Sequence, residues 1–246
     1  MQFQDKVVVI TGAAGGFGSV GVRRFAAEGG RVVAADLHEE PLRRLAGEVG
    51  AERVIPFAGD VSKPGDVEAM IRRATDAWGR LDVLWNNAAY YDNRTSLSQS
   101  TLETWDRTIA VTLSAVFYGC KYALPVMTAQ KSGVIVNTSS AVIHSPTNPY
   151  DIAKYAVTAV TVAAAKEGGP HNVRCVAIAP VIARTQANPT VMAGDPEAIA
   201  RAIASGLLPF MTEPDDVVDA VMFAASDKAR CITGSTINVD RGFMCR

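Results

Sequence analysis

The sequence predicts a doubly wound α/β fold, with one seven-stranded parallel sheet and helices on both of its faces. Seven short runs rich in valine, isoleucine and other apolar residues alternate with amphipathic or alanine-rich stretches. Several of these runs are apolar almost throughout, which is typical of strands that are buried on both faces. No linker, repeat or low-complexity segment divides the chain, and 246 residues suit one domain of this kind. We therefore expect residues 1–246 to form a single domain.

The expected strands and helices follow one another in β-α-β order, which favours right-handed crossovers and a parallel sheet. Strands are expected at KVVVIT (6–11), RVVAAD (31–36), RVIPF (53–57), LDVLWN (81–86), GVIVNTSS (133–140), VRCVAIAP (173–180) and STINVD (235–240). Helices are expected between them at about 16–28, 39–48, 64–78, 103–130, 149–168 and 214–225.

One stretch interrupts this alternation. From Thr185 to about Pro209 the chain reads TQANPTVMAGDPEAIARAIASGLLP, with prolines and glycines around one short helical pattern. It follows the end of the sixth expected strand, and ligands of open α/β sheets bind at the carboxyl ends of strands. We interpret 185–209 as a lid over a substrate. The alternative is a surface excursion without a binding role.

Charge and cysteine content exclude several classes of function. The chain has 24 Lys and Arg against 25 Asp and Glu, so its formal net charge is −1, and its pI is near 6.3. No basic excess marks a nucleic-acid or membrane partner, which favours a small-molecule substrate. The four cysteines form no CxxC pair and no zinc-like spacing, so we expect no metal and free thiols in a reducing cytoplasm. The beginning of the chain lacks a signal-peptide pattern, and no run approaches the ~20 apolar residues of a membrane span.

A glycine-rich turn follows the first expected strand. In VVVITGAAGGFGSVGVRRF, Gly12 permits a tight turn, while Gly16 and Gly18 let the backbone approach a diphosphate and let the helix pack on the strand. The free N–H groups of the helix N-terminus then face the negative charge. Glycines alone are a weak signal, but the strand before them and the helix after them favour a dinucleotide site.

Asp36 ends the second expected strand and selects among dinucleotides. A carboxylate there can accept hydrogen bonds from both hydroxyls of an adenosine ribose, and it would repel a 2′-phosphate. No Arg or Lys stands beside it, nor at Ala14 or Gly15. These residues predict NAD as the cofactor. The alternative for Asp36 is a solvated acid at a strand end.

The segment PYDIAKY (149–155) places Tyr150 and Lys154 one helical turn apart, on the same helix face. An ammonium and a positive nicotinamide would both stabilise a phenolate, lowering a tyrosine pKa from ~10 toward neutrality. Such a phenol can exchange a proton with an alcohol oxygen during hydride transfer. Taken alone, this pair is also common in ordinary helices.

Six motifs in order resemble the classical short-chain dehydrogenase/reductase family, and the resemblance covers nearly the whole chain. They are the glycine turn from Thr11 to Gly18, GDVS (59–62), NNAA (86–89), the pair Tyr150 and Lys154 after NTSSA, APVIART (179–185) and CITGSTINVDRG (231–242). The resemblance implies one Rossmann-type domain that is both dinucleotide-binding and catalytic.

The family's residues carry over position by position. The resemblance implies Ser140, Tyr150 and Lys154 as the catalytic set, with the second serine of the pair, not Ser139, holding the substrate oxygen. Lys154 would also hydrogen-bond the nicotinamide ribose. The implied cofactor-binding residues are Gly12, Gly16, Phe17, Gly18, Asp36, Asp60, Val61, Asn87, Tyr150, Lys154, Pro180, Ala183 and Thr185.

The chain departs from the family pattern at several positions. Many members carry an asparagine in the long central helix that anchors a water in the proton relay, and the matching residue here is Thr112. The family's PG dipeptide is Pro180-Val181, and NNAG ends in Ala89. The ten residues from Ser140 to Tyr150 are two or three fewer than usual, which would reshape the substrate pocket.

Several side chains are candidates for contact with the substrate. His144 lies in the shortened loop, either as an exposed loop histidine or as a residue that hydrogen-bonds the substrate or acts as an auxiliary acid/base. Tyr90 and Tyr91 follow NNAA and either line the pocket or pack beneath the lid. Met192 lies in the expected lid. Together with the two tyrosines and the apolar residues Val142, Ile143, Leu207 and Phe210, it indicates an apolar or cyclic substrate.

Taken together, the sequence predicts a cytoplasmic, NAD-dependent oxidoreductase that transfers a hydride between nicotinamide and a secondary alcohol or ketone. The alternative from another class is a catalytically impaired NAD(H)-binding sensor or structural protein, motivated by Thr112 and the altered PG. A sugar-nucleotide dehydratase or epimerase is a weaker alternative. The resemblance also implies a homo-oligomer, with a tetramer favoured, that packs through the helices at 103–130 and 149–168.

Overall fold

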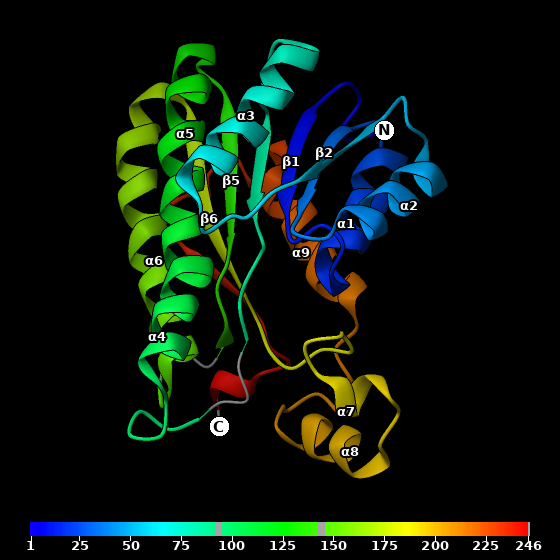
Figure 1. The fold of residues 1–246 in the computed structure, drawn as a ribbon, viewed down its shortest axis with the longest axis vertical. Coiled ribbons are helices and arrows are strands. Elements are labelled where there is room, and N and C mark those ends of the chain that lie inside the picture. The colour runs from blue at the N-terminus through cyan, green and yellow to red at the C-terminus, as the bar shows by residue number, and fades with distance from the viewer. Residues whose placement is uncertain (92–94, 142–145, 246) are drawn as a thin grey trace.

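The computed structural model describes residues 1–91, 95–141 and 146–245 (Figure 1). Seven strands form one parallel sheet in the order β3-β2-β1-β4-β5-β6-β7, which confirms the predicted fold class. The strands are β1 (Val7–Thr11), β2 (Arg31–Asp36), β3 (Val54–Ala58), β4 (Val83–Asn86), β5 (Gly133–Thr138), β6 (Val173–Pro180) and β7 (Thr236–Val239). The strand order reverses between β1 and β4, where open α/β sheets form their binding crevice.

Helices cover both faces of the sheet. They are α1 (Gly16–Ala27), α2 (Glu39–Val49), α3 (Pro64–Trp78), α4 (Leu102–Thr108), α5 (Ala115–Gln130), α6 (Pro149–Gly168), α7 (Pro189–Met192), α8 (Pro196–Ala204) and α9 (Pro214–Ala225). Helices α1, α2 and α9 lie on one side of the sheet, and α3, α5 and α6 lie on the other (Figure 1).

The two faces of β1 show why its residues are all apolar. Val8 and Ile10 pack into the core beneath α1, α2 and α9, while Val7 and Val9 pack into the core beneath α3, α5 and α6. All four side chains are fully buried. A strand covered on both faces needs no polar alternation, so the interpretation of the apolar runs is confirmed.

The predicted helix at 103–130 is interrupted by a π-helical turn over Ile109–Ser114, between α4 and α5. The continuous helical stretch Leu102–Gln130 is the one helix in the described residues that is long and apolar enough to cross a membrane. It contains scattered polar residues such as Lys121, so it is not an unbroken apolar run of the kind sought in the sequence. Core helices of water-soluble proteins satisfy the same criterion, and here Ala123, Leu124 and Met127 pack against the sheet.

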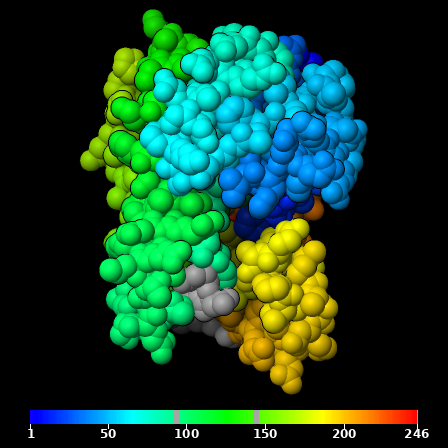
Figure 2. All heavy atoms as spheres, viewed as in Figure 1, coloured from blue at the N-terminus to red at the C-terminus, as the bar shows by residue number. Residues whose placement is uncertain are grey.

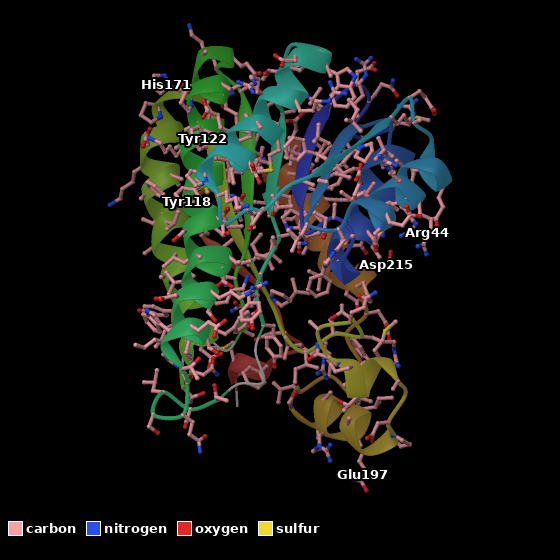
Figure 3. The ribbon with its side chains drawn as sticks, in the orientation of Figure 1. Arg44, Tyr118, Tyr122, His171, Glu197 and Asp215 are labelled. Atoms are coloured by element: carbon pink, nitrogen blue, oxygen red, sulfur yellow. The ribbon has the colours of Figure 1, made fainter. Side chains whose placement is uncertain are left out.

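The segment expected as a lid, 185–209, holds two short helices, α7 and α8, where the sequence indicated one helical pattern. Its residues Val191, Ala198 and Ala202 form a small core together with Met211, which follows the segment. It lies beyond the carboxyl ends of the strands, with Glu197 pointing away from the sheet (Figure 3). We call residues 185–209 the lid segment.

Candidate active site

A cavity of about 1010 Å³ opens at the carboxyl ends of the strands. It lies between the sheet, α4 and the lid segment, and the space-filling view shows a hollow there (Figure 2). The cavity brings together most of the site residues expected from the sequence: Gly12, Gly16, Phe17, Asp36, Asp60, Val61, Asn87, Tyr90, Tyr91, Tyr150, Lys154, Pro180 and Thr185.

Five of the expected site residues are not among the described residues that line the cavity. Gly18, Ser140, Ala183 and Met192 are outside the cavity lining formed by the described residues. Ala183 is buried beside it in an isolated bridge with Thr212, and Met192 is exposed on the lid segment. His144 lies outside the described residues, as do Val142 and Ile143.

In the glycine turn, neighbouring segments approach the backbone so closely that side chains would not fit. Gly12 has φ +65°, and a Cβ there would lie 3.0 Å from the Cα of Ala88. A Cβ on Gly18 would overlap the carbonyl oxygen of Gly12, so the helix can pack on the turn only with glycine. A Cβ on Gly16 would lie 2.6 Å from Cγ2 of Thr185, which begins the lid segment.

The NNAA segment fastens the end of β4 to this turn. The hydroxyl of Thr11 accepts hydrogen bonds from the backbone N–H groups of Asn87 (2.9 Å) and Ala88 (3.0 Å). The amide nitrogen of Asn87 donates back to the carbonyl of Thr11 at 3.0 Å. These reciprocal bonds fix the strand end and the turn as one wall of the cavity.

Asp36 is held at the cavity's edge with its carboxylate oriented. One oxygen accepts from the N–H of Ala14 at 3.0 Å and the other accepts from the N–H of His38 at 3.2 Å. Each oxygen retains acceptor capacity after one bond, since a carboxylate has about four lone-pair sites. Asp36 is therefore preorganised to accept further hydrogen bonds from a ligand in the cavity.

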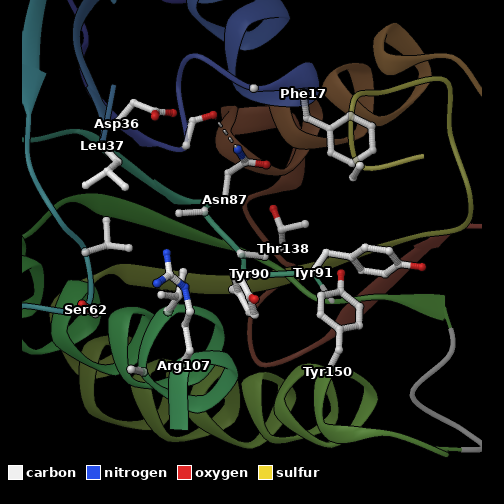
Figure 4. A pocket seen from close by; sticks show the side chains of 18 of the residues that line it. Phe17, Asp36, Leu37, Ser62, Asn87, Tyr90, Tyr91, Arg107, Thr138 and Tyr150 are labelled. Atoms are coloured by element: carbon white, nitrogen blue, oxygen red, sulfur yellow. Dashed lines mark hydrogen bonds between the residues drawn. The ribbon is translucent and has the colours of Figure 1, made fainter. Parts of the chain in front are cut away.

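Arg107 is a site residue that the sequence analysis missed. It lies in α4, lines the cavity, and holds its guanidinium carbon 4.9 Å from the centre of the Tyr90 ring (Figure 4). Hydrogen bonds from Ser62 lower the pKa of Asp60, and the positive charges of Lys63 and then Arg107 add smaller effects in the same direction. No motif marks this arginine, because only the packing of α4 across the cavity brings it there.

The start of α6 is fixed by a reciprocal cap. The side chain of Asn148 accepts from the N–H of Asp151 at 3.0 Å, and the Asp151 carboxylate accepts from the Asn148 amide at 2.7 Å. Pro149 occupies the first turn, where its missing N–H costs no helical bond. This cap determines where the helix begins, and so where Tyr150 and Lys154 face the sheet.

Lys154 lines the cavity and is almost fully buried. Its ammonium donates to the carbonyl of Thr138 at 2.6 Å and lies 5.6 Å from the centre of the Tyr150 ring. Burial lowers the pKa of Lys154 to about 7, because the protein interior solvates a cation poorly. The amine is thus placed to change its protonation state near neutral pH.

Replacing Lys154 by methionine is expected to stabilise the protein at low pH relative to wild type. Below pH 7 the folded wild type keeps a buried cation. Between pH 7 and the ordinary lysine pKa the folded state releases this proton before the unfolded state does, so wild-type stability rises. The unfolding free energy of the variant minus that of the wild type should therefore fall by about 2–3 kcal/mol between about pH 6 and about pH 9.

Urea unfolding at a series of pH values measures this difference. The lost hydrogen bond to Thr138 adds a constant offset that does not depend on pH. Lys166→Met, on the exposed side of the same helix, is the matched control and is expected to follow the wild type. A Lys154→Met difference that is constant with pH would contradict the prediction.

The two serines after β5 have different surroundings. Ser139 lines the cavity, and its hydroxyl donates to the carbonyl of Lys154 at 2.9 Å. Ser140 is the next residue and is 7% exposed. The proton of Ser139 is therefore engaged in fixing α6 to the strand end, and the assignment of Ser140 stays a prediction.

Tyr150 packs against the ring of a second tyrosine. The ring of Tyr91 meets it edge-on, with centroids 5.1 Å apart and an interplanar angle of 84°. Tyr90 lies farther along the cavity, toward Arg107 (Figure 4). The end of the cavity at Tyr150 is thus apolar and aromatic, while the opposite end at Asp36 is charged.

Thr112 lies in the π-helical turn and is fully buried. Its hydroxyl accepts from the N–H of Tyr90 at 3.1 Å and donates to the carbonyl of Tyr90 at 3.3 Å. It therefore ties the helix to the segment after β4. The preceding residue, Val111, lines the cavity.

Replacing Thr112 by valine is expected to cost about 1–3 kcal/mol in unfolding free energy, because the Tyr90 N–H and carbonyl would lose a buried partner. The matched control is Thr108→Val, one turn earlier. Thr108 is equally buried, but its hydroxyl has no hydrogen-bond partner within the described ranges. That variant should be neutral or stabilising in urea unfolding. Equal losses in the two variants would contradict this account of Thr112.

Comparison with known proteins agrees with this geometry. A family model described as enoyl-(acyl carrier protein) reductase matches residues 12–244. Momilactone A synthase of Oryza sativa subsp. japonica is 35% identical, with 96% of this chain and 89% of the relative covered. Borneol dehydrogenase, mitochondrial, of Lavandula x intermedia is 32% identical, with 98% and 91% covered. The crystal structure of 3-ketoacyl-(acyl-carrier-protein) reductase from Brucella melitensis complexed with NADH has a TM-score of 0.91 and 31% identity, covering 98% of this chain and 99% of that one.

The sheet order and the cavity at its switch point are those of a dinucleotide-binding oxidoreductase fold. More specifically, the chain belongs to the classical short-chain dehydrogenase/reductase family. Its relatives include dehydrogenases and reductases, so its class is that of an oxidoreductase.

Proposed function

We propose that this protein is an NAD-dependent dehydrogenase/reductase that transfers a hydride between nicotinamide and a secondary alcohol or ketone. The observation that carries the proposal is the meeting of two sets of residues in one cavity. Tyr150 and the buried Lys154 line its aromatic end, while the glycine turn and Asp36 line its charged end. A dinucleotide bound along the cavity would place its nicotinamide at the first end and its adenosine ribose at the second.

NAD as the cofactor is supported by the surroundings of Asp36. Its carboxylate is oriented by two backbone N–H groups and can accept hydrogen bonds from the ribose hydroxyls, whereas it would repel a 2′-phosphate. The NADH in the Brucella relative's structure supports the same choice. The turn from Gly12 to Gly18 would hold the diphosphate, and the bound nicotinamide would supply the hydride-accepting carbon.

In the oxidative direction, Tyr150 would take the proton of the alcohol oxygen as the hydride leaves the carbon. Lys154 would favour the phenolate by its charge, and its low pKa lets it pass a proton on near neutral pH. Ser140 would hold the substrate oxygen. Thr112 would support the relay indirectly, by fixing the π-helical turn, whose residues Ala110 and Val111 line the cavity.

An apolar, cyclic substrate is supported by the residues around the catalytic end. Tyr91 packs against Tyr150, and Tyr90 lies next to them. Met192 and Leu207 on the lid segment, and Phe210 just after it, expose about half of their surface without lining the cavity, and a movement of the lid segment toward a bound apolar substrate would cover them. A relative named for borneol, a bicyclic alcohol, supports the same class.

The experiment is a panel of secondary alcohols with NAD and with NADP, followed by absorbance of the reduced cofactor at alkaline pH. The panel includes borneol, cyclohexanol and the open-chain 2-butanol. We expect turnover with NAD, and higher kcat/KM for the cyclic alcohols. Tight NADH binding without turnover of any panel member would instead favour the impaired sensor considered from the sequence.

The same proposal extends to assembly and compartment. We propose a homotetramer in the cytoplasm without nucleic-acid or membrane partners. Phe117 on α5 and Tyr155 and Val162 on α6 are exposed apolar side chains, which a neighbouring copy would cover. Light scattering should give a mass four times that of one chain, and a stable monomer at micromolar concentration would contradict this.

A further inference from the structure

Arg241, two residues after the end of β7, is in an unusual backbone conformation. Its φ is +56°, in the left-handed region that favours glycine. It is also 7% exposed, although arginine is rarely buried. Both features cost free energy, so the contacts that Arg241 makes have to offset them.

The guanidinium caps the end of α8. It donates to the carbonyl groups of Ala202 (2.5 Å), Ile203 (3.0 Å) and Leu208 (3.2 Å), and to the hydroxyl of Thr212 (2.9 Å). The last carbonyl groups of a helix have no partner within the helix and carry the negative end of its dipole. The carbonyl of Ala202 also accepts from the Ser205 hydroxyl at 2.8 Å, and that of Ile203 from the N–H of Gly206 at 3.1 Å. The arginine therefore adds a charge-assisted bond to each and complements their partial charge.

The backbone of Arg241 holds the same stretch from the other side. Its carbonyl accepts from the N–H groups of Leu207 (2.7 Å) and Leu208 (3.1 Å). The packing is close, since a Cβ on Gly206 would lie 2.9 Å from Nη1 of Arg241, and a Cβ on Gly242 would lie 2.9 Å from the Leu207 side chain. One residue thus binds the carboxyl half of the lid segment through both its side chain and its main chain.

The amino-terminal half of the lid segment is positioned differently. Thr185, Gln186 and Ala187 line the cavity, and Thr185 lies against the glycine turn. The two halves share the small core that includes Val191 and Ala202. Fixing the end of α8 therefore also limits where the cavity-lining residues can lie.

We propose that Arg241 is a positioning residue, which anchors the carboxyl end of the lid segment to the sheet and thereby sets the wall of the substrate pocket without touching the substrate. The expected effect of Arg241 on kinetics rests on the proposed function. The anchoring of the lid segment does not depend on that function and can be tested without turnover.

The test uses the full chain and three variants. Arg241→Gly removes the guanidinium and relieves the left-handed backbone, so the protein should still fold. Arg241→Lys keeps the charge but can fill fewer of the acceptors. The matched control is Arg174→Ala, because half-buried Arg174 also donates to two backbone carbonyl groups, of Ser226 and Ile232, away from the lid segment.

Hydrogen exchange followed by mass spectrometry measures directly how firmly Arg241 holds the lid segment. In Arg241→Gly the amides of residues 196–211 should exchange at least about tenfold faster than in wild type, with Arg241→Lys intermediate. Arg174→Ala should leave these amides unchanged. Wild-type exchange rates at 196–211 in Arg241→Gly would overturn the anchor, whether or not the protein turns over any alcohol.

Steady-state kinetics with NAD reads the positioning role, using the panel alcohol that the wild type oxidises best. Arg241→Gly should raise the KM for the alcohol about tenfold, with kcat and the dissociation constant for NADH changed less than about threefold. Faster exchange together with a wild-type KM would overturn the positioning role. A wild type that oxidises no alcohol contradicts the proposed function alone, because the exchange result still decides the anchor.

Discussion

Tyr150→Phe is expected to lower kcat by about 10²- to 10⁴-fold, the usual contribution of a positioned general acid or base. The variant loses one oxygen and keeps the ring that packs on Tyr91, so the cavity should retain its shape. The dissociation constant for NADH should change less than about threefold, because a phenol contributes one hydrogen bond to binding. Rapid-mixing kinetics and NADH fluorescence titration give the two values.

Tyr155→Phe is the matched control for this variant. Tyr155 is on the same helix, directly after Lys154, and is 57% exposed. Its loss of a hydroxyl should leave kcat unchanged. If Tyr150→Phe kept full activity, or if both variants lost it equally, the proposed acid/base would be wrong.

Asp36→Ser should change which cofactor the protein prefers. The carboxylate would make charge-assisted hydrogen bonds to the ribose, each worth about 1.5–3 kcal/mol. Its removal is expected to lower kcat/KM for NAD by about 10²-fold. The loss of repulsion should raise kcat/KM for NADP, so that the NAD/NADP ratio falls by about 10³-fold.

Asp60→Asn separates a specific effect at Asp36 from a general effect of charge in the cavity. Asp60 also lines the cavity, and its carboxylate accepts from the N–H and hydroxyl of Ser62. Its neutralisation should change kcat/KM for NAD and NADP by similar factors, because Asp60 is not the carboxylate proposed to meet the 2′ position, and the NAD/NADP ratio should stay within about threefold of wild type. An unchanged ratio in Asp36→Ser would contradict the assignment of NAD.

The strands and main helices could be predicted because their signals are local. The run at 6–11 is apolar since β1 is covered on both faces. Pro149 marks the start of α6 in the sequence, and the structure adds the hydrogen bond from the N–H of Asp151 to the Asn148 side chain that caps this helix. The residues of the cavity could also be grouped in advance, since carboxyl ends of parallel strands meet at one edge of the sheet.

Other features depend on contacts between distant segments, which no local pattern encodes. The π-helical turn at 109–114 brings Thr112 to Tyr90, 22 residues earlier in the chain. Arg107 reaches the cavity because α4 crosses it. Arg241 meets Ala202 across 39 residues. Local propensity would place glycine, not arginine, at a left-handed position, so tertiary contacts decide there.

The central claim is hydride transfer from the carbinol carbon of a secondary alcohol to NAD. The most direct measurement uses the best panel alcohol with deuterium on that carbon, and determines the mass of the reduced cofactor after turnover. We predict that each NADH formed carries one deuterium and that Tyr150→Phe forms it far more slowly. Reduced cofactor without deuterium, or none formed from any alcohol of the panel, would contradict the account.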